Sequence, residues 1–370
     1  MNGGLYRSVH ATPDGVPPAA EYGVTLISVG SPFPGAPQGA PPRADRPGAP
    51  TGSSGGSTAG NSAIMAVGSL VSRVIGFARN ALIGMALGAG IGDAYTSAQF
   101  LPSQIYELLL GGILSSVLIP LLVRRRKADP DDGVEFTRAL LTFAVVSLGV
   151  ATLLVVAAAP LITALQSGAG TSGAYRGLVT HFAYLMLPII FFTGLSAMIG
   201  AVLNVRGHFA APMWAPILNN LVVITVCGLF IVIFGTAKGL RPEDMTGGRI
   251  ALLGLGTLLG MVVQAVGLLP ALRKVGFRWR WRWAPRSLGL GEVGRLAGWM
   301  LCYVGANQVA VFVVVRLLNR VAGKNSASVL AFNNVFLLTM MAHGIIGVSV
   351  MTALLPKMSA AAAEGRYAEV

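Results

Sequence analysis

Charged residues are scarce in this sequence. Asp, Glu, Lys and Arg make up 11% of its 370 residues, whereas a soluble domain usually carries about 25%. With so few charges, much of the surface cannot face water. The rest of the composition agrees, since 54% of the residues are hydrophobic and the mean hydropathy is +0.69. The scarcity argues against a soluble protein and predicts an all-α polytopic membrane protein, because helices satisfy their own backbone hydrogen bonds in lipid.

Cysteine and histidine are also rare. The two cysteines, Cys227 and Cys302, both lie in apolar runs, and the four histidines are scattered along the chain. No CxxC or HExxH pattern occurs, so we expect neither a disulfide nor a metal site. The sequence also lacks the cluster of Asp, Glu or His that an enzyme acting on lipid-linked sugars would need at the membrane surface. We therefore expect no enzyme activity, no metal ion and no cofactor.

Long apolar runs are abundant beyond residue 60. Residues 1–60 are rich in Gly, Pro, Ala and Ser. We expect a disordered cytoplasmic tail there, because such a composition buries too little apolar surface to offset the entropy lost on ordering. Each later run approaches the ~20 residues that a membrane-spanning helix needs. We predict about eight transmembrane helices, at 62–87, 103–123, 139–165, 177–204, 212–235, 249–272, 294–319 and 328–355.

The basic residues between these runs predict the orientation. The loops after the second, fourth and sixth helices, with the chain end after the eighth, hold fifteen Lys and Arg residues, and the loops on the other side hold six. Because short cytoplasmic loops carry the excess of positive charge, both termini are expected in the cytoplasm. Membrane topology thus accounts for the net charge of +13, and no nucleic-acid partner is expected.

One stretch, FRWRWRWAPR at 277–286, alternates arginine with aromatic residues. Binding of RNA or of anionic lipid headgroups is one interpretation of this pattern. The favoured interpretation is a short extended or amphipathic link on the inner leaflet, because Trp and Arg both prefer the membrane interface.

Three arginines lie inside expected spans, Arg73 and Arg79 in the first and Arg316 in the seventh. A charged group at mid-bilayer costs at least ~2.5–3.5 kcal/mol, so it normally faces a cavity or a partner. Arg73 and Arg79 are about 9 Å apart along the helix axis, and the nearest acids in sequence are Asp93 and Glu107. This scarcity of counter-charge favours an anionic ligand, a phosphate or diphosphate. The alternative for Arg79 and Arg316 is snorkelling to the interface.

These arginines belong to a wider set of landmarks. The sequence has SRVIGFAR at 72–79, LGAG at 87–90, AVLNVRGHF at 201–209 and GIIG at 344–347, with Leu-Pro pairs at 101–102, 269–270 and 355–356. In this order, over about residues 62–360, the sequence resembles the MurJ/MviN family, the lipid II flippases of bacterial cell-wall synthesis.

The resemblance implies the fold of the multidrug/oligosaccharidyl-lipid/polysaccharide exporters, in which two six-helix lobes flank a central cavity. It assigns 61–275 to a six-helix N-lobe, 276–293 to a basic, aromatic cytoplasmic linker, 294–360 to the first two helices of a second lobe, and 361–370 to a cytoplasmic end. About six further helices of the family pattern are missing, which predicts a C-terminally truncated chain.

The resemblance also implies that the two arginines of the first helix line the cavity. The predicted substrate-binding residues are Arg73, Arg79, Asp93 and Arg316. An arginine found in the second helix of some family members falls here at Tyr106, and an Asp-Arg pair of their eighth helix falls at Asn333–Asn334. The expected cavity is therefore less cationic than in those members.

The function that follows from the resemblance is transfer of lipid II, an undecaprenyl-diphosphate-linked disaccharide-pentapeptide, across the bacterial cytoplasmic membrane by alternating access. The expected partners are lipid II and membrane lipids, with cell-wall synthesis or division proteins as further candidates. Two alternatives remain, a polysaccharide-lipid exporter of the same superfamily and a non-transporting membrane scaffold for cell-wall synthesis. A cationic-drug exporter is disfavoured, because it should have an acidic cavity.

Overall fold

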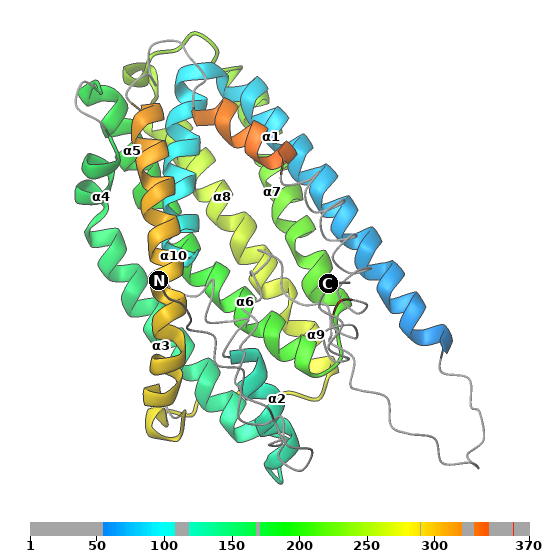
Figure 1. The fold of residues 1–370 in the computed structure, drawn as a ribbon. Coiled ribbons are helices and arrows are strands. Elements are labelled where there is room, and N and C mark those ends of the chain that lie inside the picture. The colour runs from blue at the N-terminus through cyan, green and yellow to red at the C-terminus, as the bar shows by residue number, and fades with distance from the viewer. Residues whose placement is uncertain are drawn as a thin grey trace, which may run out of the picture. The chain divides into compact units, whose positions relative to one another are not determined.

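The computed structural model describes residues 55–107, 118–167, 171–288, 290–319, 329–339 and 358. All of them belong to a single contact unit. The secondary structure of the described residues is helical throughout (Figure 1). The α-helices are α1 (Gly55–Tyr106), α2 (Ile119–Ala128), α3 (Val134–Ala157), α4 (Ala159–Gln166), α5 (Gly173–Met186), α6 (Ile189–Val205), α7 (Ala210–Phe234), α8 (Gly247–Gly267), α9 (Leu269–Lys274), α10 (Leu290–Asn319) and a further apolar helix at Val329–Thr339. Short 3-10 helices lie at Pro242–Asp244 and Pro285–Leu288.

Six helical stretches of the described residues are long and apolar enough to cross a membrane. They are Val71–Tyr106, Val134–Ala157, Gly173–Val205, Ala210–Phe234, Gly247–Lys274 and Cys302–Asn319. This confirms the all-α polytopic membrane fold. The second and eighth expected spans continue into 108–117 and beyond 339, outside the described residues, so the number of about eight and the domain limits stay predictions.

The expected tail at 1–60 also lies mostly outside the described residues. Its last six residues, however, already belong to α1, which begins at Gly55. Hydropathy marks where a helix enters lipid, whereas a helix can extend beyond that point into a polar segment. The expected tail itself stays a prediction.

Helix α1 turns sharply at Gly88. The apolar stretch 71–106 has 36 residues, and as one straight helix it would be about 54 Å long, well beyond the ~30 Å hydrocarbon core. Gly88 has φ 69° and ψ −165°, and a Cβ there would lie 3.1 Å from Cα of Lys238. Figure 1 shows α1 turning at the upper end of the bundle, with its second half (cyan) running back down and diverging from its first half (blue). The second helix thus begins just after Gly88 rather than at the expected residue 103.

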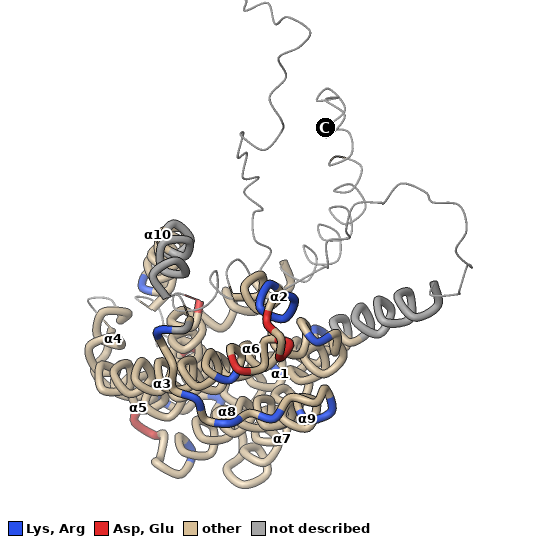
Figure 2. Tube along the Cα trace, turned by 90° about the horizontal axis from the view of Figure 1, so that it is seen from below, with Lys and Arg blue, Asp and Glu red and all other residues tan. Residues whose placement is uncertain are grey.

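The turns between helices divide between two ends of the bundle (Figure 1). One end, called the basic end below, carries α2, the turns at 129–133 and 206–209, α9 and the segment that follows it. Figure 2 looks at this end, where Lys and Arg mark α2 and α9. The opposite end carries the turn at Gly88, residues 171–172 before α5, and residues 235–246. Prolines 160 and 188 lie where α3 passes into α4 and α5 into α6, as expected for a residue that interrupts helix hydrogen bonding.

Separate apolar clusters fill the two halves of the bundle. The cluster nearer the opposite end includes Ile91, Tyr95, Tyr175, Phe182 and Phe230. The cluster nearer the basic end includes Phe136, Leu140, Leu203, Phe277 and Leu288. The polar Tyr95 hydroxyl is satisfied inside the first cluster by the Thr257 hydroxyl at 2.6 Å, so the returning half of α1 is tied to α8.

Candidate substrate site on the first helix

Arg79 lies half-buried on α1 with only neutral partners. Its Nε and Nη2 donate hydrogen bonds to Oδ1 of Asn80 at 3.3 and 3.2 Å, and its Nη1 donates to Oδ1 of Asn220 at 3.2 Å. The ion pairs between described residues lie elsewhere, at Arg125–Asp129 and Arg282–Glu135. Two amide oxygens orient the guanidinium but leave its charge uncompensated within the described residues, in a helix that crosses the membrane.

Asn220 connects this arginine to a second helix. It lies on α7, is 7% exposed, and its Nδ2 donates to the carbonyl oxygen of Ser72 at 3.4 Å. Gly76 packs beside it, and a Cβ there would lie in ordinary van der Waals contact, 3.5 Å from the same Nδ2. One amide side chain therefore binds the α1 backbone with its nitrogen and Arg79 with its oxygen. Sequence reasoning missed Asn220, and the available signal was an amide within an apolar span, a group that usually bonds to a neighbouring helix.

Arg73 lies half-buried on the same stretch of α1, six positions before Arg79 and next to the Ser72 carbonyl that Asn220 binds. The two guanidinium-bearing residues are thus separated by about 9 Å along one helix axis. We call Arg73, Arg79, Asn80 and Asn220 the α1 arginine site. It contains two of the four residues that the sequence predicted.

Asp93 contacts a different element. It is fully buried, and its Oδ1 accepts a hydrogen bond from the backbone N–H of Leu330 at 2.8 Å. Leu330 is the second residue of the helix Val329–Thr339, and a carboxylate at a helix N-terminus is favoured by the helix dipole. The turn at Gly88 explains why this acid is buried, since it lies in the returning helix rather than in a loop.

Arg316 also contacts a different element from Arg79. It lies near the end of α10, and its Nη1 donates to the carbonyl oxygen of Leu165 in α4 at 2.6 Å. The hydrogen bonds of Asp93 and Arg316 thus join helices at the opposite end of the bundle. Arg73 and Arg79 lie on the same stretch of α1, whereas Asp93 and Arg316 bind other elements.

A buried polar network surrounds Asn319, the last residue of α10. Asn319 is 1% exposed, and its Oδ1 accepts hydrogen bonds from the Ser97 and Tyr175 hydroxyls at 2.8 and 3.1 Å. Its Nδ2 donates to the Gln166 carbonyl oxygen at 3.5 Å. We call Ser97, Gln166, Tyr175 and Asn319 the Asn319 network. It fastens α10 to α1, α4 and α5 at the opposite end, and sequence reasoning did not predict it.

The residues at which the sequence departs from some family members are half-buried. Tyr106 ends α1, and Asn333 and Asn334 lie on the helix Val329–Thr339. Oδ1 of Asn334 is buried without a hydrogen-bond partner. None of these side chains adds a positive charge. Nor do the described residues contain a group of three or more His, Cys, Asp or Glu side chains suited to a metal ion.

Comparison with known proteins gives a consistent match. Residues 83–370 match the family described as lipid II flippase MurJ. The lipid II flippase MurJ of Burkholderia cenocepacia is 27% identical over 272 residues, or 73% of this chain and 50% of that protein. The probable lipid II flippases MurJ of Buchnera aphidicola and Rhizobium tropici are 25% and 26% identical over 275 and 285 residues, covering 73% and 75% of this chain and 50% of each relative. The chain spans about half the length of the curated relatives it matches.

The family match begins at residue 83, after Arg73 and Arg79. The assignment of these two arginines therefore depends on their own sequence context and on the geometry of α1.

Proposed function

We propose, from the premise that this chain belongs to the MurJ family of lipid II flippases, that its α1 arginine site binds the diphosphate of lipid II as the lipid crosses the membrane. The chain is a multi-pass protein of the bacterial inner membrane, as its family and its apolar helices indicate. The observation that carries the proposal is the bonding of Arg79, whose charge is held between helices by two neutral amides.

A diphosphate matches the chemistry of this site. Guanidinium groups form forked, charge-assisted hydrogen bonds to phosphate oxygens, and these bonds are stronger than those between neutral groups. Asn80 and Asn220 fix the orientation of Arg79 in advance without neutralising it, so less side-chain entropy is lost on binding. Arg73, about 9 Å along the axis, supplies a second charge to the same hydrated region. The role is one of binding and transfer, with no bond made or broken.

The orientation is part of the same proposal. The basic end faces the cytoplasm and the N-terminus lies on that side, because positive charge accumulates in short cytoplasmic loops. The basic loops after α2 and α9 support this, since both lie at one end of the bundle (Figure 2). Lipid II would then approach from the leaflet at the basic end and leave toward the opposite end.

Alternating access supplies the mechanism of transfer. At the opposite end, the Asn319 network joins α10 to α1, α4 and α5, and Asp93 binds the helix Val329–Thr339. These contacts keep that end closed while the basic end admits the lipid. Release of the headgroup requires them to separate, and a conformational change of this kind needs a ligand with different affinity for the two states.

The test is replacement of the arginines in the whole chain, expressed from its native gene in a bacterium depleted of its own lipid II flippase. We expect Arg73→Ala/Arg79→Ala to abolish growth. In nanodiscs, lipid II affinity should fall about tenfold or more for each arginine, since a hydrogen bond to a charged group contributes about 1.5–3 kcal/mol. Arg79→Lys keeps the positive charge but loses the paired N–H donors of the guanidinium. Its lipid II affinity should therefore lie between those of the parent and of Arg79→Ala.

A matched control removes one charge far from the site. Arg241→Ala changes an exposed arginine at the opposite end and should leave growth and lipid II binding near the parent values. Normal growth of the Arg73→Ala/Arg79→Ala variant, at parent expression, would rule out diphosphate binding by these residues.

A further inference from the structure

The segment that joins α9 to α10 is fixed to the bundle rather than loose. Residues Phe277–Ala284, called the strap below, are extended and run along the basic end (Figure 1). Phe277 at its start is 1% exposed and Leu288 just beyond it is 3% exposed, and both belong to the basic-end apolar cluster. The Arg206 guanidinium lies 5.1 Å from the centre of the Phe277 ring. Both ends of the strap are therefore buried.

Helix α3 holds the middle of the strap. The Thr142 hydroxyl oxygen accepts hydrogen bonds from Nε1 of Trp279 at 3.3 Å and from the backbone N–H of Arg282 at 3.1 Å. Nε of Arg138 donates to the carbonyl oxygen of Arg278 at 3.1 Å. The Trp283 ring stacks on Phe143 with centroids 6.2 Å apart. Contacts from two successive turns of α3 thus fix the strap in one conformation.

These contacts also fix the depth of the strap. Thr142 lies eight residues after Val134, where α3 begins, which is about 12 Å along the axis. The Arg282 backbone is bonded at the level of Thr142, yet its guanidinium forms an ion pair with Glu135, at 2.6 Å, near the start of the helix. An arginine that reaches back in this way toward the polar zone is snorkelling. The strap therefore lies alongside α3 at the membrane interface rather than beyond the end of the bundle.

The strap presents aromatic and cationic side chains on its outer side. Trp281 is 64% exposed and Trp283 is 54% exposed, and Arg278 and Arg280 are exposed beside them. Arg286, two residues beyond the strap, is exposed as well. Exposed tryptophans at interface depth fit a lipid headgroup region, where the amphipathic indole ring is favoured.

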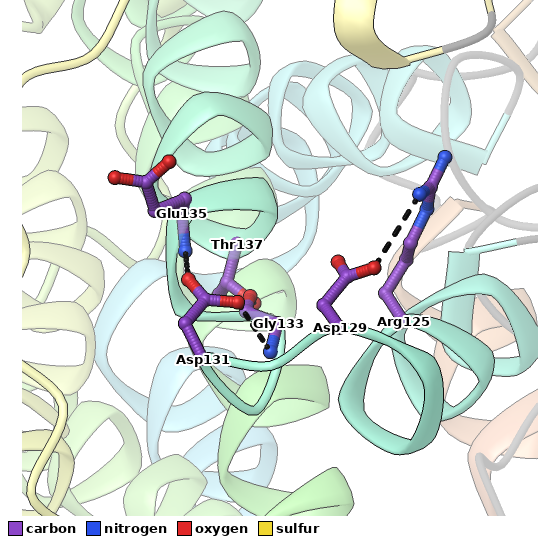
Figure 3. A network of polar contacts seen from close by, with 6 residues as sticks. All are labelled: Arg125, Asp129, Asp131, Gly133, Glu135 and Thr137. Atoms are coloured by element: carbon purple, nitrogen blue, oxygen red, sulfur yellow. Dashed lines mark hydrogen bonds and ion pairs between the residues drawn. The ribbon is translucent and has the colours of Figure 1, made fainter.

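The nearby acids do not neutralise these arginines. In the turn between α2 and α3, Asp129 pairs with Arg125, and Asp131 accepts hydrogen bonds from the backbone N–H groups of Gly133 and Glu135 (Figure 3). Glu135 pairs with Arg282. Among the described residues, Arg278, Arg280 and Arg286 therefore have no acidic partner. Burial, followed by the neighbouring Arg126, lowers the pKa of Arg206, while Asp132 and Asp131 act in the opposite direction.

We propose that the strap is a binding site for the phosphate headgroup of an anionic glycerophospholipid in the leaflet at the basic end. Arg278, Arg280 and Arg286 bind the phosphate and its negative charge, and Trp281 and Trp283 lie at the boundary between headgroup and acyl chain. The site is distinct from the α1 arginine site, and it requires no transfer of lipid II. Because the strap is also the covalent link to α10, a bound lipid would hold the start of α10 against the helices that precede it.

The depth of the strap favours a lipid over RNA. Single-stranded RNA binds aromatic residues by stacking bases on rings that face water. Trp279 is bonded inward to α3 and Trp283 is stacked on Phe143, so these two rings are only partly available to bases, and the exposed side chains lie at the depth of Thr142 on α3. An anionic lipid meets both the arginines and the tryptophans at that depth.

The first experiment measures lipid preference with the whole chain in nanodiscs. A charge variant, Arg278→Gln/Arg280→Gln/Arg286→Gln, is compared with a matched control, Lys127→Gln/Arg273→Gln/Lys274→Gln, which loses three exposed charges from the same end. Native mass spectrometry then counts phosphatidylglycerol retained relative to phosphatidylcholine. The parent should prefer phosphatidylglycerol, and the strap variant should lose that preference by on the order of fivefold per arginine. The control should keep most of it.

The second experiment locates the lipid. In variants with one tryptophan retained, at residue 279, 281 or 283, brominated phosphatidylglycerol should quench Trp281 and Trp283 strongly and the inward-facing Trp279 weakly. Three results would overturn the proposal: equal loss of preference in the control, unchanged preference in the strap variant, or strong binding of a single-stranded RNA oligonucleotide that the strap variant loses while its lipid preference stays unchanged. Neither experiment measures flipping, so failure here is separable from failure of lipid II transfer.

Discussion

At the scale of single residues, Arg79 takes its position from two amide side chains. An acid in place of either amide would orient the guanidinium equally well and would also cancel its charge. Asn80 and Asn220 orient it and leave the charge in place. A site for a diphosphate needs this combination, because binding energy depends on a cation that is fixed in advance and still unpaired.

Two substitutions at Asn220 separate these effects. Asn220→Ala removes the acceptor for Arg79 and the bond to the Ser72 carbonyl, so it should lower the free energy of unfolding by about 1.5–3 kcal/mol and weaken lipid II binding. Asn220→Asp also loses the bond to Ser72 but keeps the acceptor for Arg79. Its new carboxylate should pair with Arg79, so the variant should be more stable than Asn220→Ala and should still lose lipid II affinity. Thermal unfolding and lipid II titration in nanodiscs check both changes. An Asp variant that binds lipid II as tightly as the parent would contradict the role of the uncompensated charge.

The sequence could point to the two arginines of α1 but not to the asparagines that lie between helices. An arginine in an apolar span is anomalous in any conformation, so the sequence alone identified Arg73 and Arg79. Asn220 supports Arg79 only because one face of α7 meets α1. That contact depends on tertiary packing, which a single sequence does not contain. The same holds for Asn319, whose partners come from three other helices.

At the scale of helices, hydropathy ended the first span at residue 87, next to the turn that divides α1, but began the second span at residue 103 instead of just after the turn. The stretch Ala86–Gly92 reads ALGAGIG and carries no charge, so nothing in its polarity shows how short the turn is. The turn depends on Gly88 adopting positive φ, a conformation that glycine enters without the steric cost of a Cβ. Asp93 was placed in a loop for this reason, whereas it is buried in the returning helix.

Helices α7 and α8 depend on glycine in a different way. A Cβ at Gly260 would approach the Asn219 side chain and lie 3.1 Å from its carbonyl oxygen, so this glycine lets the two backbones come close. Gly260→Leu should separate the two helices and lower the free energy of unfolding by about 1–3 kcal/mol, because an overpacked interface cannot relax without moving the backbone. Gly228→Leu on α7 is the matched control, because nothing lies within 4 Å of a Cβ there. Unfolding temperatures in detergent should fall for the first variant alone, and equal values for both would contradict the close packing.

At the scale of the whole molecule, α10 is held at both ends. The strap binds α3 near the start of α10 through Trp279 and Arg282, and the Asn319 network binds its last residue. A rocking motion that opens the opposite end must break the network, while the strap retains the connection at the basic end. In the proposed motion the two attachments would have different roles: the strap would act as a pivot, and the Asn319 network would close the opposite end.

A reversible cross-link tests the closure. In a background of Cys227→Ala and Cys302→Ser, Ser97→Cys/Asn319→Cys places two thiols where the parent side chains are 2.8 Å apart, within reach of a short bifunctional thiosulfonate reagent. Cross-linking should stop lipid II transfer in a growth or flipping assay yet leave lipid II binding intact, because the α1 arginine site remains open from the basic end. A reducing agent should restore transfer, and each single-cysteine variant should be insensitive to the reagent. Transfer at the parent rate with the cross-link complete would mean that the opposite end opens without separating α10 from α1, and the proposed motion would be wrong.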